Sequence, residues 1–234
     1  MTWSTGLDGF RVVGNLSELS REQRALLLDR STSTDAIVRD VTRRIIERVR
    51  CSGDDALFAL AAELDGVELR SLEIPREECE AALADLPAGV RRAMLRAAAN
   101  IEAVHRASMP AEVDLSPEAG VRIVRRPDPL RRVGVYAPGG RAAYPSSVLM
   151  GAIPARVAGV GEVVLCSPPD KVGRPSRSVL AAAAISRVDR VFAIGGAGAI
   201  AALAYGTATV PRVDRIVGPG NSYVVEAKLQ VASD

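Results

Sequence analysis

The segment Arg132–Met150, which reads RVGVYAPGGRAAYPSSVLM, decides the fold of this chain of 234 residues. An apolar strand pattern runs into a Pro-Gly-Gly turn, and a helix pattern follows. A second block, Val217–Lys228 (VGPGNSYVVEAK), repeats this order of strand, glycine turn and helix. Such junctions place backbone amides at the carboxyl ends of strands, which is where open α/β sheets bind nucleotides.

The same alternation continues over residues 126–234. Strand and helix patterns that follow one another at this spacing predict a parallel, doubly wound α/β sheet. We therefore expect one domain over 126–234, with the turns APGG, SPP, GGAG and GPGN along one edge of its sheet. The predicted strands are Arg132–Tyr136, Glu162–Cys166, Arg190–Ile194 and Asp214–Val217, and the predicted helices lie near Pro145–Ala158, Ser176–Arg187, Ala197–Tyr205 and Asn221–Val231.

Residues 1–125 have a different, mainly helical pattern and form the second predicted region. Apolar residues recur at spacing four in Thr34–Arg50, with arginines between them, as in an amphipathic helix. Acidic residues open a second helix at Asp54–Leu64, where they suit the helix dipole. Leu69–Ile74 is a candidate for a short strand, and further helices are predicted at Arg76–Leu86 and Ala88–Ala107.

The composition is that of an ordinary globular protein, with 48% hydrophobic and 25% charged residues. A net charge of +2 gives no reason to expect a nucleic-acid partner or a membrane surface. The three cysteines form no CxxC pair, so the sequence indicates neither a zinc ribbon nor a disulfide framework. No secretory signal and no apolar run of membrane-spanning length is present, and we expect a cytoplasmic location.

Two residues are candidates for contacting a ligand at the sheet edge. In the GPGN block the glycines allow close approach of the backbone, and Asn221 is a good N-cap for a helix whose N-terminus suits a pyrophosphate. Tyr136 lies where a strand gives way to the Pro-Gly-Gly turn, so its ring could stack on a ligand or its hydroxyl could bind one. The alternatives are a plain capping turn at Asn221 and a half-buried aromatic side chain at Tyr136.

The segment Gly196–Ala201 matches the dinucleotide pattern G-x-G-x-x-A and follows a predicted strand. That pattern also requires an acidic residue at the end of the next strand, whereas Asp214 stands at the beginning of its strand. The match also falls on the third strand of the alternating region rather than the first. A structural, glycine-rich helix entry is therefore the favoured interpretation.

Nucleophilic and metal chemistry have little support in the sequence. His105 is the only histidine, and on the flank of a long helix a structural role is favoured. One histidine supports neither a Ser-His-Asp triad nor a metal site built from several histidines. Cys166 has no accompanying base and is interpreted as a small buried core residue.

The motifs of this chain resemble those of one enzyme family. The blocks VGVYAPGG, YPSSVLM, IPARVAGV, VVLCSPP, IGGAGAIAALAYGT and VDRIVGPGNSYVVEAK, in this order and spacing, are similar to bacterial histidinol dehydrogenases. The SGDDAL segment after the first long helix fits as well, so the resemblance covers essentially the whole chain. The PGG and GPGN blocks together are highly specific to that family.

The resemblance implies a fold, an activity and cofactors. It implies a Rossmann-like architecture related to aldehyde dehydrogenases, and an NAD-dependent, zinc-dependent homodimer that oxidises L-histidinol to L-histidine in histidine biosynthesis. The family's NAD contacts fall on Tyr136 and Asn221. A third contact in the family is a glutamine, at a position that Gly198 occupies here.

Family members are considerably longer than this chain. By resemblance, their zinc ligands, their proton-transferring Glu-His pair and their substrate contacts lie beyond the position of Asp234. We therefore expect no catalytic or zinc-binding residue in these 234 residues, and no turnover by the chain alone. Two alternatives stay open: a non-catalytic nucleotide-binding or interaction module derived from the family, and a relative that oxidises another small polar alcohol.

Overall fold

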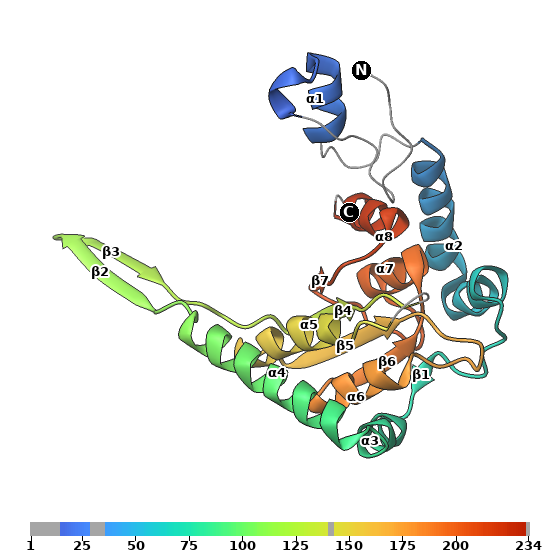
Figure 1. Ribbon diagram of the computed structural model, residues 1–234. Helices are drawn as coiled ribbons and strands as arrows, with labels where there is room; N and C mark the ends of the chain where they lie inside the picture. Colours follow the sequence, from blue (N-terminus) through green and yellow to red (C-terminus); the bar gives the residue numbers. More distant parts are fainter. Residues whose placement is uncertain (1–14, 29–35, 140–142, 233–234) are drawn as a thin grey trace. The chain divides into compact units, whose positions relative to one another are not determined.

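The computed structural model describes residues 15–28, 36–139 and 143–232. The chain divides into two compact units, Met1–Thr34 and Asp35–Asp234. The described part of the first unit holds a short 3-10 helix η1 (Leu16–Glu18) and a helix α1 (Arg21–Leu28). All further description concerns the second unit (Figure 1).

A five-stranded sheet in the order β1-β6-β5-β4-β7 forms the centre of the second unit. Strands β4 to β7 are mutually parallel, with Tyr136 opposite Cys166 in the register of β4 and β5, while β1 pairs antiparallel with β6. The predicted parallel sheet is confirmed, and its predicted strands lie within one residue of the observed ones. The strands are β1 (Glu73–Ile74), β4 (Arg132–Tyr136), β5 (Glu162–Ser167), β6 (Arg190–Ala193) and β7 (Arg215–Val217).

Helices cover both faces of this sheet, as expected for a doubly wound fold (Figure 1). Three helices share one hydrophobic cluster with the sheet, and four helices pack against its other face through a second cluster. The first group is α2 (Ala36–Leu60), α7 (Gly196–Tyr205) and α8 (Ser222–Val231), and the second is α3 (Arg76–Ala84), α4 (Ala88–Ala107), α5 (Pro145–Val157) and α6 (Arg177–Ile185).

The strand residues alternate between these two clusters. Tyr136 and Cys166 belong to the cluster with α2 and α7, whereas Val135 and Leu165 belong to the cluster with α5 and α6. Both faces are buried, which explains why the strand sequences are continuous apolar runs rather than alternating ones. None of the helices in the described ranges is long and apolar enough to cross a membrane.

The predicted pair of helices after residue 34 is one element interrupted by a glycine. Helix α2 contains a break at Gly53, whose φ of 52° lies in the left-handed region. Past Leu60 the helix widens into a π-helical turn η2 (Ala61–Asp65), and Gly66 ends it in the left-handed conformation. The break at Gly53 lies between the two predicted helices.

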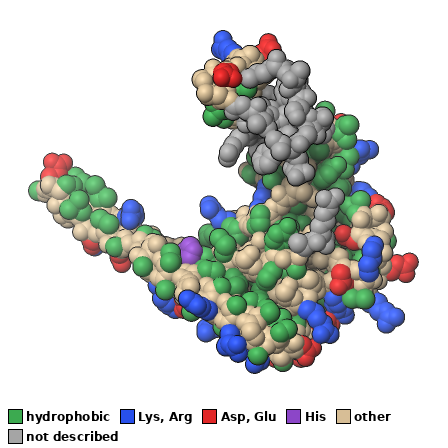
Figure 2. Space-filling model, viewed as in Figure 1, with side chains coloured by type: hydrophobic (Ala, Val, Ile, Leu, Met, Phe, Trp, Pro, Cys, Tyr) green, Lys and Arg blue, Asp and Glu red, His purple; other side chains and the backbone are tan. Residues whose placement is uncertain are grey.

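A two-stranded hairpin of β2 (Val113–Glu118) and β3 (Val121–Arg125) was missing from the predicted elements. Every residue of both strands is exposed, and Figure 2 shows hydrophobic side chains along it. Gly120 allows the turn between the strands with a φ of 82°. The hairpin lies at the end of the region predicted as mainly helical, and the division at residue 125 stays a prediction.

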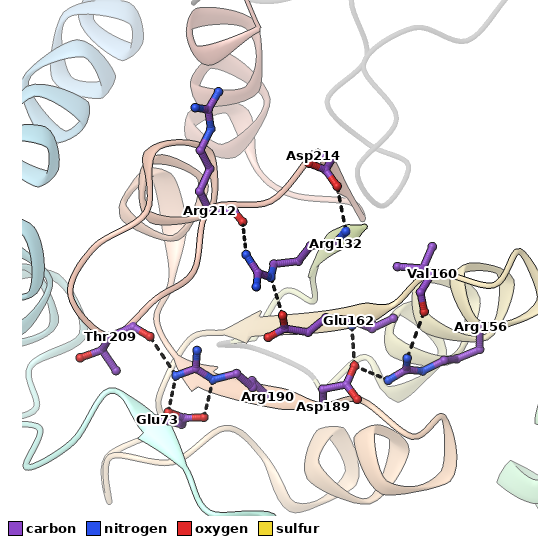
Figure 3. A network of polar contacts seen from close by, with 11 residues as sticks. Glu73, Arg132, Arg156, Val160, Glu162, Asp189, Arg190, Thr209, Arg212 and Asp214 are labelled. Carbon is purple, nitrogen blue, oxygen red and sulfur yellow. Dashed lines mark hydrogen bonds and ion pairs between the residues drawn. The ribbon is translucent and has the colours of Figure 1, made fainter. Parts of the chain in front are cut away.

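Ion pairs join the amino ends of the strands (Figure 3). Arg132 pairs with Glu162 at 2.6 Å, which links the first residues of β4 and β5. A carboxylate oxygen of Asp189 accepts a hydrogen bond from the N–H of Val163 at 2.6 Å. Arg190 binds Glu73 of β1 through two nitrogens at 2.8 and 2.6 Å. These contacts connect neighbouring strands at the amino ends of β4, β5 and β6. The carboxyl ends of the parallel strands lie on the opposite side, where they line a cavity.

Candidate functional site

A cavity of about 1030 Å³ lies at the carboxyl ends of the parallel strands. All four turns that follow β4, β5, β6 and β7 contribute to its lining, as the sequence predicted. Apolar residues of α2 form another part of the wall, among them Ile45, Leu57 and Leu60. The turn residues are Pro138, Gly139, Pro168, Pro169, Gly195, Gly196, Pro219 and Gly220, while Gly140 of the Pro-Gly-Gly turn lies outside the described residues.

Tyr136 lies in the wall of this cavity and is only 3% exposed. Its phenol oxygen accepts a hydrogen bond from the N–H of Gly196, the first residue of α7, at 3.1 Å. Burial raises the pKa of Tyr136, while the hydrogen bond from Gly196 acts in the opposite direction. The phenol therefore stays protonated at neutral pH and keeps its proton for donation. Tyr136 is more deeply buried than the half-buried aromatic of the alternative interpretation.

Asn221 is exposed and also lines the cavity. Its side-chain oxygen accepts a hydrogen bond from the N–H of Val224 at 3.1 Å, so the predicted N-cap is confirmed. The oxygen is thus used within the helix, and the amide nitrogen is the group of Asn221 that can donate to a ligand.

The turn from Gly218 to Asn221 is held tightly against β4. Gly218 has a φ of 110°, and a Cβ atom built there would lie 2.0 Å from the carbonyl oxygen of Tyr136. The ammonium group of Lys228 donates to the carbonyl oxygen of Gly218 at 2.6 Å, and burial lowers the pKa of Lys228. Only a glycine allows this approach, which places the turn beside Tyr136.

Two helix N-termini open into the same cavity. The lining includes Gly196 and Ala197 at the start of α7, and Gly220 and Asn221 at the start of α8. The first N–H groups of a helix have no partner within it and carry partial positive charge, which attracts phosphate groups. No arginine or lysine is among the described lining residues. The cavity therefore suits an anionic ligand bound by backbone amides.

Gly198 is buried in α7 and faces α2. A Cβ atom at this position would lie 3.2 Å from Leu60 Cδ1 and 3.6 Å from Leu57 Cδ2. Gly196 enters the helix with a φ of 59°. In the G-x-G-x-x-A match, Gly198 is therefore explained by its packing against α2 and Gly196 by its positive φ. This supports the structural interpretation of the segment.

Asp65 is a lining residue that the sequence analysis missed. It ends η2 and is half-buried, and burial raises the pKa of its carboxyl group while the charge of Lys171 lowers it. The ammonium group of Lys171 donates to the carbonyl oxygen of Asp65 at 3.3 Å. In the sequence, Asp65 is recognisable only as part of an Asp-Gly pair at a helix end, a pattern that predicts a turn but not a ligand contact.

The interpretation of Cys166 as a buried core residue is confirmed, while the structural role favoured for His105 stays a prediction. Cys166 is fully buried, and burial raises the pKa of its thiol. His105 is exposed in the last turn of α4 and is not among the lining residues. Within the described ranges, no group of three His, Cys, Asp or Glu side chains is placed to hold a metal ion.

Comparison with known proteins identifies the family. The family model described as histidinol dehydrogenase matches residues 28–234. The chain belongs to the histidinol dehydrogenase family. The family assignment covers the whole second unit, including the cavity and the turns that line it.

Individual relatives of this family are similar over most of the chain. Histidinol dehydrogenase of Nitrosomonas europaea is 48% identical over 88% of this chain and 48% of its own length. The relative from Methanosarcina mazei is 46% identical over 92% of this chain and 50% of its own length. The crystal structure of histidinol dehydrogenase from Elizabethkingia anophelis has a TM-score of 0.80 and 32% identity over 84% of this chain and 45% of that chain. The chain therefore spans about half the length of these relatives.

Proposed function

We propose that this chain forms the NAD-binding part of an L-histidinol dehydrogenase, an oxidoreductase of histidine biosynthesis. The observation that carries the proposal is the cavity at the carboxyl ends of the strands, into which two helix N-termini open. In doubly wound folds this is where dinucleotides bind. The family membership of residues 28–234 supplies the chemical class of the reaction.

The residues of the cavity fit a dinucleotide. The turn glycines let the turns that line the cavity pack closely against one another: a Cβ atom at Gly195 would lie 2.8 Å from Pro168. The N-termini of α7 and α8 would bind the pyrophosphate, and the Tyr136 phenol and the Asn221 amide would donate hydrogen bonds to its oxygens or sugars. Bound NAD supplies the hydride acceptor of the oxidation.

Zinc does not fit the described residues in the same way, because they offer no cluster of ligands. We therefore derive no step through the metal. The zinc requirement, L-histidinol as substrate, the homodimer and the cytoplasmic location are parts of this proposal that come from the resemblance to the family.

Isothermal titration calorimetry of the chain with NAD⁺ tests the proposal. We expect binding, and we expect Asn221→Ala to weaken it about tenfold, since the substitution removes one donor and the cap of α8. Asn100→Ala is the matched control, because Asn100 is exposed on α4 and is not among the lining residues. A chain that binds no NAD⁺ would contradict the proposal.

Turnover is measured separately by NADH absorbance after addition of L-histidinol. We expect no rate above the blank from the 234-residue chain. Oxidation of an alcohol needs a group that accepts the hydroxyl proton, and the described cavity offers no histidine for this step. A rate above the blank would overturn this expectation.

A further inference from the structure

Asp65 is the one carboxylate among the described residues that line the cavity. It ends the π-helical turn η2, a type of turn that is often found at functional sites. Its backbone is fixed from two sides: the N–H of Gly66 donates to the carbonyl oxygen of Ala61, and Lys171 binds the carbonyl oxygen of Asp65 itself. Asp65 is therefore held in the cavity wall by an ordered turn.

The carboxylate of Asp65 makes no hydrogen bond with any residue in the described part of the chain, although the residue is half-buried. A partly desolvated carboxylate without donors is costly, and the cost falls when a ligand brings hydroxyl groups to it. Its negative charge also reaches the phenol of Tyr136, as one of the smaller causes that raise the pKa of that tyrosine. Asp65 and Tyr136 both line the same cavity.

Among the described residues that line the cavity from the turns at the carboxyl ends of β4, β5, β6 and β7, none is acidic. A carboxylate at the carboxyl end of a strand binds ribose hydroxyls in many dinucleotide-binding domains. Asp214 is at the other end of β7, where its carboxylate accepts a hydrogen bond from the N–H of Arg132 at 2.8 Å. Asp65 supplies a carboxylate from the helical wall of the cavity instead.

We propose that Asp65 accepts hydrogen bonds from the adjacent hydroxyl groups of a ribose in the bound dinucleotide and selects NAD⁺ over NADP⁺. The inference rests on the proposed NAD-binding function. A carboxylate has two oxygens that accept two hydroxyl donors at once. A 2′-phosphate would replace one donor with negative charge close to Asp65. The described lining holds no arginine or lysine, and the nearby ammonium group of Lys171 already binds the carbonyl oxygen of Asp65.

The test compares the affinities of NAD⁺ and NADP⁺ by calorimetry for the 234-residue chain and two variants. Asp65→Asn keeps the shape of the side chain and removes its charge. Glu68→Gln removes the same charge from an exposed residue nearby that is not among the lining residues. We expect the unchanged chain and Glu68→Gln to prefer NAD⁺ by about tenfold or more, and Asp65→Asn to lose most of that preference.

Each outcome decides one of the two proposals. If Asp65→Asn keeps the full preference for NAD⁺, the role of Asp65 is wrong while the NAD-binding function stands. If the unchanged chain binds neither dinucleotide, the proposed function fails and the role of Asp65 fails with it. Thermal unfolding followed by circular dichroism reports whether Asp65→Asn folds. If Asp65→Asn does not fold, the affinities for NAD⁺ and NADP⁺ are compared in Asp65→Ser instead.

Discussion

The phenol oxygen of Tyr136 accepts a hydrogen bond from the backbone N–H of Gly196 at 3.1 Å. This bond joins the end of β4 to the first turn of α7 and so connects two motifs that are far apart in the sequence. It uses one N–H of the helix N-terminus and orients the tyrosine in the cavity wall. The hydroxyl proton of Tyr136 remains for a ligand.

Replacement of Tyr136 by phenylalanine removes this acceptor. We expect Tyr136→Phe to lower the free energy of unfolding by about 1–2 kcal/mol, because the N–H of Gly196 loses its partner, and to weaken NAD⁺ binding. Urea unfolding and calorimetry measure the two effects. Tyr223→Phe is the control, since Tyr223 also lines the cavity and its hydroxyl makes no hydrogen bond with the described residues. Equal stability losses in both variants would contradict the role of the bond.

Substitution of Gly218 should be severe. An alanine there has a strained φ of 110° and its Cβ would collide with the carbonyl oxygen of Tyr136 at 2.0 Å. We expect Gly218→Ala to cost more than about 2 kcal/mol in the free energy of unfolding. Gly89→Ala in α4 meets no atom within 4 Å and should be neutral or stabilising by up to about 1 kcal/mol. Similar denaturant midpoints for Gly218→Ala and Gly89→Ala would refute the claim that the backbone requires glycine at position 218.

Asp189 connects strands at the amino edge of the sheet (Figure 3). It accepts hydrogen bonds from the N–H of Val163 and from the guanidinium group of Arg156. We expect Asp189→Ala to lower the free energy of unfolding by about 1–3 kcal/mol, because a part-buried N–H loses its acceptor. Asp85→Ala breaks the pair with Arg177, whose side chain is 80% exposed, and should have little effect. The difference between their urea midpoints measures the contribution of Asp189.

The buried thiol of Cys79 makes stability depend on pH in the alkaline range. Burial raises its pKa to about 11 from a reference value of 9.0. The thiol therefore ionises in the unfolded chain before it ionises in the folded one, and this contribution to stability is complete below pH 9.0 and is lost as the pH rises to about 11.

We expect Cys79→Ala to flatten the fall of unfolding free energy over this pH range, as measured by urea titrations. The difference in slope isolates Cys79 from the other titrating groups. Cys51, which is exposed, serves as the control site, and Cys51→Ala should leave the slope unchanged. If the unfolding free energy of Cys79→Ala fell with pH as steeply as that of the unchanged chain, folding would not raise the pKa of the Cys79 thiol.

Gly198 stands where the family resemblance expects a glutamine that contacts NAD. A Cβ atom at Gly198 would lie 3.2 Å from Leu60 Cδ1, so the Leu60 side chain must shift to admit a larger residue. Leu60 and Leu57 both line the cavity, and we expect the amide of Gly198→Gln to reach it past the shifted Leu60 and to tighten NAD⁺ binding. Gly198→Ala is the control, because alanine raises helix propensity as glutamine does but adds no amide group. Calorimetry that finds Gly198→Gln no better than Gly198→Ala would show that the amide makes no contact in this chain.

Much of the second unit could be predicted because its signals are local. The parallel strands are short apolar runs followed by glycine or proline, and each helix begins at a turn residue such as Asn221. The hairpin at β2 and β3 was missed, because its apolar residues alternate weakly and all its side chains are exposed. A burial pattern could not reveal this element, because all of its residues are exposed in the described part of the chain.

From the sequence come the alternation of strands and helices over 126–234, the edge of the sheet at which the four turns meet, and the family. Those features depend on residues that are close together in the chain. Three relations come only from the tertiary structure: Tyr136 accepts a hydrogen bond from the first N–H of α7, Gly198 faces α2, and Asp65 lines the cavity. These relations arise from packing between distant segments, and no local periodicity or motif records which side chains such packing brings together.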